Sequence, residues 1–479
     1  MFRCRFYLEQ QWCQFDCRNT IETRDLPSSS DSMTISRRTK IIATMGPALD
    51  EPGALERLLA EGVDVLRVNL SHASPADQLA RVQRARAICP DIAILADLCG
   101  PKLRLGILER ERIVVDGETI IFGEGGIPVG DPSLYERVAP GDPVYIADGT
   151  IHTEVLRVER DHIVCRVGSG GTIRSRKGIN LPNDQSQLPC LTDKDRFDLS
   201  TLHVLEPDFV ALSYVRHEND IAEVRRFTDL PIVAKIEKQQ ALDRIDAIVA
   251  ACDAVMVARG DLGVEIPIER VPASQKKLIR TANNAGKPVI TATQMLVSMV
   301  SNPIPTRAEV TDIANSVLDG TDAVMLSEET AVGRDPGAAV EMMARVVRET
   351  EPSLPFNDSL SRKEPDNAIA YAAAKLAEDL DAVAIIAPTR TGVSAQRLAA
   401  FRSHRQILAY SRVPATTRRL RLVWGVKAMD LKVQNGVDPI VATLEAARRD
   451  LPAGSRVVLL DIAPRGAIGV PSIVNAITL

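Results

Sequence analysis

The sequence is poor in aromatic residues, carries no surplus of positive charge, and contains neither a Cys-x-x-Cys pair nor a long apolar run. Aromatic residues make up only 4% of the chain, so its cores must rely on Val, Ile, Leu, Ala and Met. The formal net charge of −5 does not suit a nucleic-acid-binding protein, whose surface is basic overall. No apolar run approaches the roughly 20 residues that a membrane helix needs, so we expect no membrane association.

The cysteines are too scattered to predict a disulfide framework or a metal site. They stand at Cys4, Cys13, Cys17, Cys89, Cys99, Cys165, Cys190 and Cys252. This distribution is typical of a reduced, intracellular chain, and we therefore expect a cytoplasmic protein.

The first 36 residues are polar and irregular and end in a turn-rich, serine-rich run. Four arginines in this segment are typical of a transit peptide, but the acidic residues interspersed with them are not. We therefore expect residues 1–36 to be a disordered tail. Met33 lies just ahead of the first apolar run, so translation starting there is an alternative.

Short apolar runs rich in β-branched residues alternate with helical stretches after this tail. Such alternation is typical of parallel strands joined by helices. Both faces of each run are apolar, which suits a closed (β/α)8 barrel, the TIM barrel, better than an open sheet. An open, doubly wound sheet is the alternative that this pattern leaves. The eight runs span 40–45, 63–70, 92–98, 209–214, 232–236, 254–258, 288–293 and 323–326.

Two further segments do not follow the barrel pattern. Residues 102–188 interrupt it after the third run and are rich in alternating strands, which predicts a small β-barrel inserted as a lid over the active face. A linker near residue 350 leads to a second α/β unit. The expected domains are therefore the barrel (37–101 and 189–350), the inserted lid (102–188) and a C-terminal α/β domain (351–479).

Polar residues gather where the barrel runs end, and in a barrel these ends face one rim. Lys235 and Arg67 supply positive charge, while Glu237 and Asp261 offer the oxygen ligands that Mg²⁺ prefers. A divalent ion beside a Lys and an Arg suits the transfer of a phosphoryl group. The polar residues at the run ends are Arg67, Asn69, Ser71, His72, Asp97, Lys235, Glu237, Arg259, Gly260, Asp261 and Thr293.

Nine segments, in family order, resemble the pyruvate kinase family. The resemblance runs from about residue 39 to the C-terminus, and it is more specific in the barrel than in the last domain. The segments are 39–47 (TKIIATMGP), 67–72 (RVNLSH), 100–104 (GPKLR), 177–182 (KGINLP), 234–237 (AKIE), 256–267 (MVARGDLGVEIP), 292–295 (ATQM), 305–309 (PTRAE) and 325–330 (MLSEET).

The resemblance implies transfer of a phosphoryl group from phosphoenolpyruvate to ADP, giving pyruvate and ATP, with Mg²⁺ or Mn²⁺ as cofactor. Lys235 would stabilise the transferring group and the enolate, and Arg67 would bind the phosphate. Glu237 and Asp261 would hold the divalent metal. The pyruvate carboxylate would lie at Gly260, Asp261 and Thr293, and Thr293 would relay the proton that converts enol to ketone.

The same resemblance places the nucleotide phosphates between the barrel and the lid. Their expected contacts are Arg104, Lys177, Asn69, His72 and Thr44. Arg104 and Lys177 flank the inserted segment, so closure of the lid could bring them onto the nucleotide. His72 could equally be a polar surface residue.

The resemblance also bears on monovalent cations. Many pyruvate kinases bind K⁺ in a pocket that corresponds here to Asn69, Ser71, Asp97 and the carbonyl of Leu98. Members that need no K⁺ resemble one another in carrying an aliphatic residue and a lysine where this chain has Leu98 and Lys102. We therefore expect Lys102 to serve as an internal cation and K⁺ not to be required. The alternative is a Lys102 side chain that points into solvent.

Residues 389–394 follow the first strand of the C-terminal domain and lead into a helix. Hydroxyls, a glycine and a helix N-terminus make a plausible phosphate site, although an ordinary helix start has the same composition. The family binds phosphorylated effectors in this loop, so we expect contacts from Thr389, Thr391, Gly392 and Ser394. The family also implies a homotetramer.

Two other functions remain to be distinguished from this one. An aldolase-type barrel enzyme that uses phosphoenolpyruvate or pyruvate would share Arg67 and the metal carboxylates, but it would not need the lid. A non-catalytic metabolite-binding relative should have lost at least one of Lys235, Glu237, Asp261 and Thr293, and all four are present.

Overall fold

The computed structural model describes residues 37–182, 189–433, 437–463 and 471–479. The predicted tail, residues 1–36, lies outside these ranges. None of the helices within them combines the length and apolar character that crossing a membrane requires.

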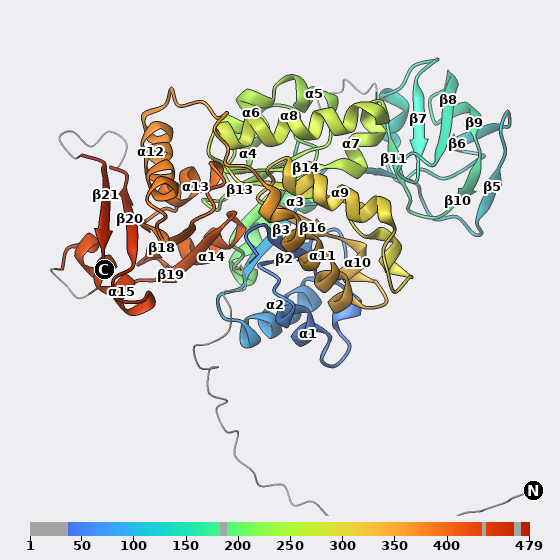
Figure 1. Ribbon diagram of the computed structural model, residues 1–479. Helices are drawn as coiled ribbons and strands as arrows, with labels where there is room; N and C mark the ends of the chain where they lie inside the picture. The colour runs from blue at the N-terminus through green and yellow to red at the C-terminus, as the bar shows by residue number, and fades with distance from the viewer. Residues whose placement is uncertain (1–36, 183–188, 434–436, 464–470) are drawn as a thin grey trace, which may run out of the picture. The chain divides into compact units, whose positions relative to one another are not determined.

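Eight parallel strands close into the predicted barrel in the order β1-β16-β15-β14-β13-β12-β3-β2 (Figure 1). Their inward side chains form a buried cluster that Leu422, from the C-terminal part of the chain, completes. The strands are β1 (Lys40–Thr44), β2 (Val65–Asn69), β3 (Ala93–Asp97), β12 (Phe209–Leu212), β13 (Ile232–Ile236), β14 (Ala254–Ala258), β15 (Val289–Ala292) and β16 (Ala323–Leu326).

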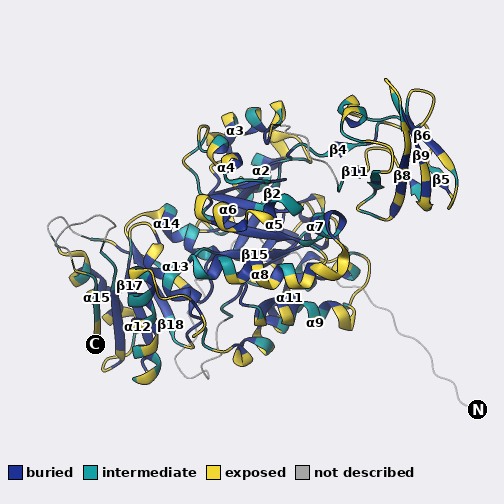
Figure 2. Ribbon diagram, turned by 90° about the horizontal axis from the view of Figure 1, so that it is seen from above, coloured by how far each residue is buried: buried dark blue, intermediate teal, exposed yellow. Residues whose placement is uncertain are grey.

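Helices follow the strands and bury their apolar faces on the barrel, while their other faces are exposed (Figure 2). Three of them begin with a reciprocal capping box, in which a hydroxyl and a carboxylate satisfy backbone N–H groups of the first turn. The main helices are α1 (Ala54–Ala60), α2 (Pro75–Ile88), α3 (Asp193–Leu205), α4 (Glu218–Val224), α6 (Ile245–Ala251), α8 (Val271–Asn284), α9 (Arg307–Leu318) and α11 (Pro336–Thr350).

The segment inserted between β3 and α3 is an antiparallel β domain, as the alternating pattern predicts. Six of its strands form one sheet in the order β4-β11-β7-β8-β9-β6, and β10 pairs with β5. The strands are β4 (Leu103–Arg104), β5 (Arg112–Val114), β6 (Thr119–Gly123), β7 (Pro143–Ile146), β8 (Ile151–Val158), β9 (His162–Ser169), β10 (Gly171–Ile173) and β11 (Gly178–Asn180).

The C-terminal part is a five-stranded sheet in the order β19-β18-β17-β20-β21, parallel except for β21. The boundaries that we predict between the three domains stay predictions. The elements of this part are α12 (Pro365–Asp379), β17 (Ala384–Pro388), α13 (Val393–Ala400), β18 (Gln406–Ser411), α14 (Pro414–Arg419), β19 (Val426–Asp430), α15 (Pro439–Asp450), β20 (Arg456–Asp461) and β21 (Ile473–Thr478).

Two ion pairs join this C-terminal part to the barrel. Arg402, only 1% exposed, donates to Asp322 Oδ2 at 3.1 Å, just ahead of β16. Arg418 of α14 donates to Asp208 Oδ1 at 2.7 Å, just ahead of β12. These contacts lie at the amino ends of barrel strands, opposite the rim where polar residues were predicted to gather.

One strand is shorter than predicted at the rim. The apolar run 209–214 predicts a strand to Tyr214, whereas β12 ends at Leu212. Tyr214 has a positive φ of 57°, which no strand residue adopts, so the chain turns immediately after the strand.

Candidate functional site

The carboxyl ends of the barrel strands bring the predicted cations and carboxylates together. Arg67, on β2, donates through Nε to Asp97 Oδ2 at 2.7 Å and through Nη1 to Thr44 Oγ1 at 3.1 Å. Burial raises the pKa of Asp97, but Lys235 and Arg67 outweigh that effect, so its pKa lies below the usual value. Asp97 is therefore an anion shared by two cations of the rim.

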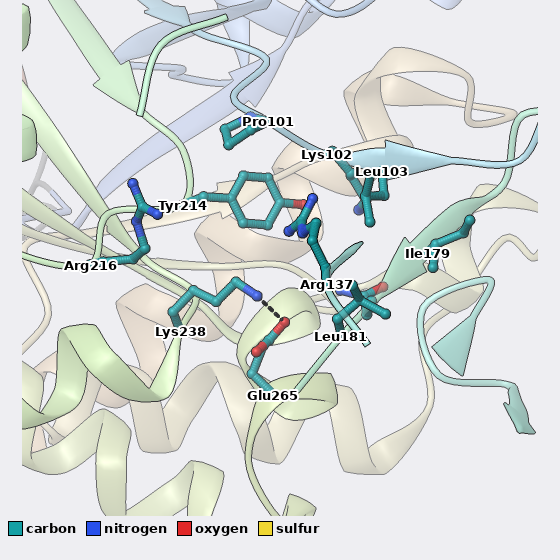
Figure 3. Close-up of a pocket in the computed structure, with 11 residues that line it drawn as sticks. Pro101, Lys102, Leu103, Arg137, Ile179, Leu181, Tyr214, Arg216, Lys238 and Glu265 are labelled. Atoms are coloured by element: carbon teal, nitrogen blue, oxygen red, sulfur yellow. Dashed lines mark hydrogen bonds and ion pairs between the residues drawn. The ribbon is translucent and has the colours of Figure 1, made fainter. Parts of the chain in front are cut away.

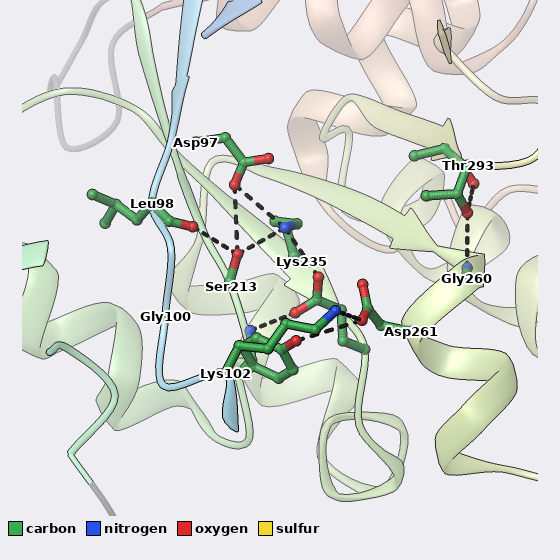
Figure 4. A network of polar contacts seen from close by, with 12 residues as sticks. Asp97, Leu98, Gly100, Lys102, Ser213, Lys235, Gly260, Asp261 and Thr293 are labelled. Atoms are coloured by element: carbon green, nitrogen blue, oxygen red, sulfur yellow. Dashed lines mark hydrogen bonds and ion pairs between the residues drawn. The ribbon is translucent and has the colours of Figure 1, made fainter. Parts of the chain in front are cut away.

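Lys235, on β13, is the centre of this network (Figure 4). Its Nζ lies 2.7 Å from Ser213 Oγ, 3.0 Å from Glu237 Oε1 and 3.3 Å from Asp97 Oδ1. Burial alone would lower the pKa of Lys235, but Asp97 and Glu237 raise it above its usual value. The ammonium is thus a fixed positive charge in a largely buried site.

Two carboxylates that could hold a divalent ion lie beside this ammonium. Glu237 is 1% exposed, and burial raises its pKa. Burial also raises the pKa of Asp261, but Lys102 and Lys235 outweigh it and leave the pKa lower than usual. Mg²⁺ is usually held by one or two carboxylates, and oxygens of substrate and water fill its remaining coordination positions. Glu237 and Asp261 therefore fit Mg²⁺ or Mn²⁺.

Thr293 follows β15 with a φ of 67°, a conformation that a β-branched residue rarely adopts. Its Oγ1 accepts from Gly260 N at 2.8 Å and donates to the carbonyl of Ala292 at 2.6 Å. Arg259 supports this turn by donating to the carbonyls of Ala292 and Thr293, at 3.1 and 2.7 Å. Two of the three residues predicted to line the carboxylate site, Gly260 and Thr293, are therefore hydrogen-bonded to each other.

The residues predicted to contact nucleotide lie at the rim and at the root of the lid. Partial burial, with Arg104 and Arg67 nearby, lowers the pKa of His72. Arg104 on β4 pairs in register with Gly178 on β11, which puts it beside Lys177. Asn69 accepts from Ser71 N at 3.1 Å, and Thr44 is buried and donates to the Leu326 carbonyl.

Lys102 lies beside Asp261, one of the two carboxylates that could hold a divalent ion. Its Nζ is 2.9 Å from Asp261 Oδ1 and 3.5 Å from Asp148 Oδ1 of the lid. Burial lowers the pKa of Lys102, but Asp261 and Asp148 raise it above the usual value. Asp97 belongs to the predicted pocket for a monovalent cation. It is paired with Arg67 and Lys235, whereas Lys102 is paired with Asp261.

A small cavity of about 30 Å³ lies beside this site (Figure 3). Lys238 and Glu265, 2.7 Å apart, lie on its wall with Tyr214, Arg216 and lid residues including Arg137 and Leu181. The volume suits about one or two water molecules rather than a substrate.

The predicted effector loop lies on a much larger cavity, of about 1280 Å³. Thr389 Oγ1 accepts from Gly392 N at 2.9 Å, and Gly392 begins α13 with a φ of 93°. Ser394 is buried. The wall also carries both basic and acidic side chains, namely Arg225, Lys287, Arg390, Arg397, Arg412, Arg419, Asp229, Asp253, Asp366 and Asp461.

Sequence reasoning missed three residues that shape the site, namely Ser213, Tyr214 and Arg259 as a support for Thr293. Ser213 and Tyr214 are the first two residues after β12, and Arg259 is the first residue after β14. They stand at the carboxyl ends of barrel strands, as the other site residues do. That position was the available signal. Only the fold shows that these side chains contact the site residues of neighbouring strands.

Comparison with known proteins agrees with this geometry. Residues 36–340 match the family model "Pyruvate kinase, barrel domain", and residues 367–473 match "Pyruvate kinase, alpha/beta domain". A pyruvate kinase of Methylorubrum extorquens is 39% identical over 467 residues, covering 92% of this chain and 98% of that protein. One from Agrobacterium vitis is 43% identical over 412 residues, covering 82% of this chain and 86% of that protein.

A solved structure is also similar. The crystal structure of a pyruvate kinase from Cryptosporidium parvum superposes with a TM-score of 0.84 at 33% identity, covering 93% of this chain and 97% of that one. The fold, the composition of the rim and these relatives agree. The chain belongs to the pyruvate kinase family, whose members transfer a phosphoryl group between phosphoenolpyruvate and ADP.

Proposed function

We propose that Lys235 is the central electrophile in phosphoryl transfer from phosphoenolpyruvate to ADP in this chain. The observation that carries this proposal is its buried ammonium, held 3.0 Å from Glu237 and 3.3 Å from Asp97 at the barrel rim. A charge fixed in advance needs no reorganisation when negative charge develops on the phosphoryl and enolate oxygens.

Glu237 and Asp261 would hold the divalent metal that the family generally uses, either Mg²⁺ or Mn²⁺. When bound, this ion neutralises negative charge on the phosphate and enolate oxygens. Around it, Arg67 would bind the transferring phosphate, since its Nη2 takes no part in the hydrogen bonds to Asp97 and Thr44. The support for this arrangement is the convergence of two cations and two carboxylates from β2, β13 and the start of α7 (Arg259–Glu265).

The pyruvate carboxylate would lie against Gly260, Asp261 and Thr293. The hydroxyl proton of Thr293 is directed to the Ala292 carbonyl. To protonate the enol, this hydroxyl must turn away from that carbonyl.

ADP would bind between the rim and the lid, with its phosphates at Arg104, Lys177, His72 and Asn69 and with Thr44 nearby. The pKa of His72 supports this grouping, because Arg104 and Arg67 both contribute to lowering it. Thr44 is buried and already donates to Leu326, so it would act through Arg67 rather than on the nucleotide itself.

We further propose that no K⁺ is required, that a phosphorylated effector binds at 389–394, and that the chain forms a homotetramer. Lys102 would supply the positive charge that K⁺ brings elsewhere. All cysteines within the described residues are free, which favours a reducing, cytoplasmic location.

A coupled assay with phosphoenolpyruvate, ADP and Mg²⁺ tests the proposed function, with pyruvate formation as the readout. We expect turnover that disappears when either substrate or the metal is omitted. Pyruvate formed without ADP would indicate a different reaction. Binding of phosphoenolpyruvate without turnover would indicate the non-catalytic alternative.

A further inference from the structure

The two residues that follow β12 form a strained turn at the centre of the site. Tyr214 has a φ of 57° although its side chain is large and buried. Bulky residues rarely adopt this conformation, and it persists only where surrounding contacts hold it. Strained residues of this kind are concentrated at functional sites, so the contacts of the turn bear on the reaction.

Ser213 fixes the position of the Lys235 ammonium. Its Oγ donates to the Leu98 carbonyl at 2.8 Å, a shorter contact than the 3.5 Å to Asp97 Oδ1. Because the single hydroxyl proton is used on that carbonyl, a lone pair faces Lys235 Nζ at 2.7 Å. Figure 4 shows Ser213 between Leu98, Asp97 and Lys235, so the hydroxyl ties β3, β12 and β13 together.

Tyr214 fixes the neighbouring carboxylate. Its backbone N–H donates to Glu237 Oε2 at 2.6 Å, which leaves Oε1 for Lys235 at 3.0 Å. Its hydroxyl lies 3.4 Å from Asp261 Oδ1. A turn of two residues therefore contacts the ammonium and both carboxylates of the site.

The root of the lid packs against this turn. A Cβ on Gly100 would lie 2.9 Å from both Ser213 Cβ and Tyr214 Cδ2, so only glycine allows this close approach. The φ of Gly100 is 68°, which also favours glycine. Gly100 stands two residues ahead of Lys102, where the chain leaves the barrel for the lid.

We infer that the Ser213–Tyr214 turn is a positioning element for phosphoryl transfer. It holds Lys235 and Glu237 in their reactive geometry and connects them to the root of the lid. This inference rests on the proposed roles of those two residues. Without the Ser213 hydroxyl, the ammonium loses its nearest neutral acceptor and is drawn to the carboxylates on either side.

The test is Ser213→Ala, with Ser213→Thr as the variant that keeps the hydroxyl. Loss of a hydrogen bond to a charged group should lower kcat by about 10- to 100-fold. The KM for phosphoenolpyruvate should change little, because Arg67 is untouched. Ser213→Thr should recover most of kcat, and Ser200→Ala, at an exposed position on α3, should match the parent enzyme.

A second readout does not depend on turnover. Oxalate, a planar dianion that resembles enolpyruvate, should bind Ser213→Ala more weakly than the parent when measured by calorimetry with Mn²⁺ present. Binding of Mn²⁺ alone should be unchanged, because Tyr214 N still holds Glu237. A general loss of structure would instead weaken both and lower the circular dichroism signal.

Gly100→Ala is an independent variant, since its methyl group would press on the turn without removing any polar contact. It should lower kcat while the circular dichroism spectrum is retained. Normal kcat in both Ser213→Ala and Gly100→Ala would overturn the inference if Lys235→Met is inactive. Normal turnover of Lys235→Met would instead contradict the proposed function itself.

Discussion

The ammonium of Lys102 lies 2.9 Å from the Asp261 carboxylate, so a residue at the root of the lid is paired with a candidate metal ligand of the barrel. The same ammonium is 3.5 Å from Asp148, within the lid. Lys102 thus forms ion pairs with one carboxylate of the lid and one of the barrel. Its partner is Asp261 rather than Asp97, which is already paired with Arg67 and Lys235.

This pairing leads to the prediction that the enzyme is active without K⁺. A unit charge about 4 Å away at an effective dielectric near 20 contributes ~4 kcal/mol, which is roughly a thousandfold in rate if it acts only in the transition state. We propose that Lys102 supplies that charge. Turnover in K⁺-free, tetramethylammonium-balanced buffer should therefore match turnover with K⁺ added.

Lys102→Glu is the matching variant, because it reverses the charge at the same position. It should lose most K⁺-free activity and regain part of it when K⁺ is added. Strong K⁺ activation of the parent would refute the hypothesis. So would a Lys102→Glu variant that is unchanged in both buffers.

Lys235→Met should remove most phosphoryl transfer while leaving the fold intact. Loss of a preorganised charge in a buried site typically lowers the rate by about 10²- to 10³-fold or more. The coupled assay measures the loss, and circular dichroism checks the fold. Lys375→Met removes an exposed lysine that pairs with Asp379 on α12 and should leave turnover unchanged. Near-normal turnover of Lys235→Met would show that another group is the electrophile.

The sequence predicts much of this site because its residues follow a rule of position. Lys235, Glu237, Asp261 and Thr293 stand where apolar runs end, and parallel strands in a closed barrel present those ends on one rim. Their convergence therefore follows from the alternation of strands and helices. The structure confirms this convergence. Lys235 lies within hydrogen-bonding distance of Glu237, and Gly260 lies within hydrogen-bonding distance of Thr293.

What the sequence could not predict depends on backbone angles and on packing between distant segments. Nothing in the run 209–214 marks Tyr214 as left-handed, so the strand was predicted two residues too long. The partner of Lys102 depends on how the lid root meets α7. The ion pair between Arg418 and Asp208 joins residues 210 positions apart, one on α14 and the other just ahead of β12.

The pKa of His72 should lie below its ordinary range in the free enzyme. Partial burial, Arg104 and Arg67 all disfavour its protonated form and lower its pKa below the ordinary value of about 6.5. The imidazole is then mostly neutral at pH 7, and the protonated form predominates only as the pH falls below the lowered pKa. Because kcat/KM reports the free enzyme, the ratio of kcat/KM for ADP between the parent and His72→Gln should change with a midpoint below pH 6.5 if His72 contacts ADP. An inflection of that ratio between pH 6.5 and 8 would contradict this prediction.

A phosphorylated activator should bind at the loop 389–394. Fructose bisphosphate, hexose monophosphates, ribose 5-phosphate and AMP are the compounds to screen, with the phosphoenolpyruvate saturation curve as the readout. Thr391→Glu and Ser394→Glu place a carboxylate where the phosphate would lie and should abolish the response without changing basal turnover. Ser200→Glu, at an exposed position on α3, is the control. If no compound has an effect, or if the response survives both substitutions, the loop is an ordinary helix start.

The buried pair of Arg402 and Asp322 should be the most sensitive contact between the barrel and the C-terminal part. Arg402 also donates to Asn283 Oδ1 at 3.2 Å, and its guanidinium lies 5.1 Å from the centre of the Trp424 ring. Asp322 also accepts hydrogen bonds from the backbone N–H groups of Val289 and Trp424, so both of its carboxylate oxygens have backbone donors. Removing the arginine alone would leave a buried carboxylate without its counter-ion.

Arg402→Met should therefore destabilise the protein by about 3–5 kcal/mol, the range for breaking one side of a buried ion pair. Chemical unfolding followed by Trp fluorescence measures this well, because Trp424 lies against the guanidinium. Arg166→Met is the matched control, since Arg166 and Glu154 form an exposed pair 3.2 Å apart that should contribute at most about 1 kcal/mol. Equal stability of the two variants would mean that the Asp322 carboxylate is adequately held by its backbone donors, and that Arg402 does not link the C-terminal part to the barrel.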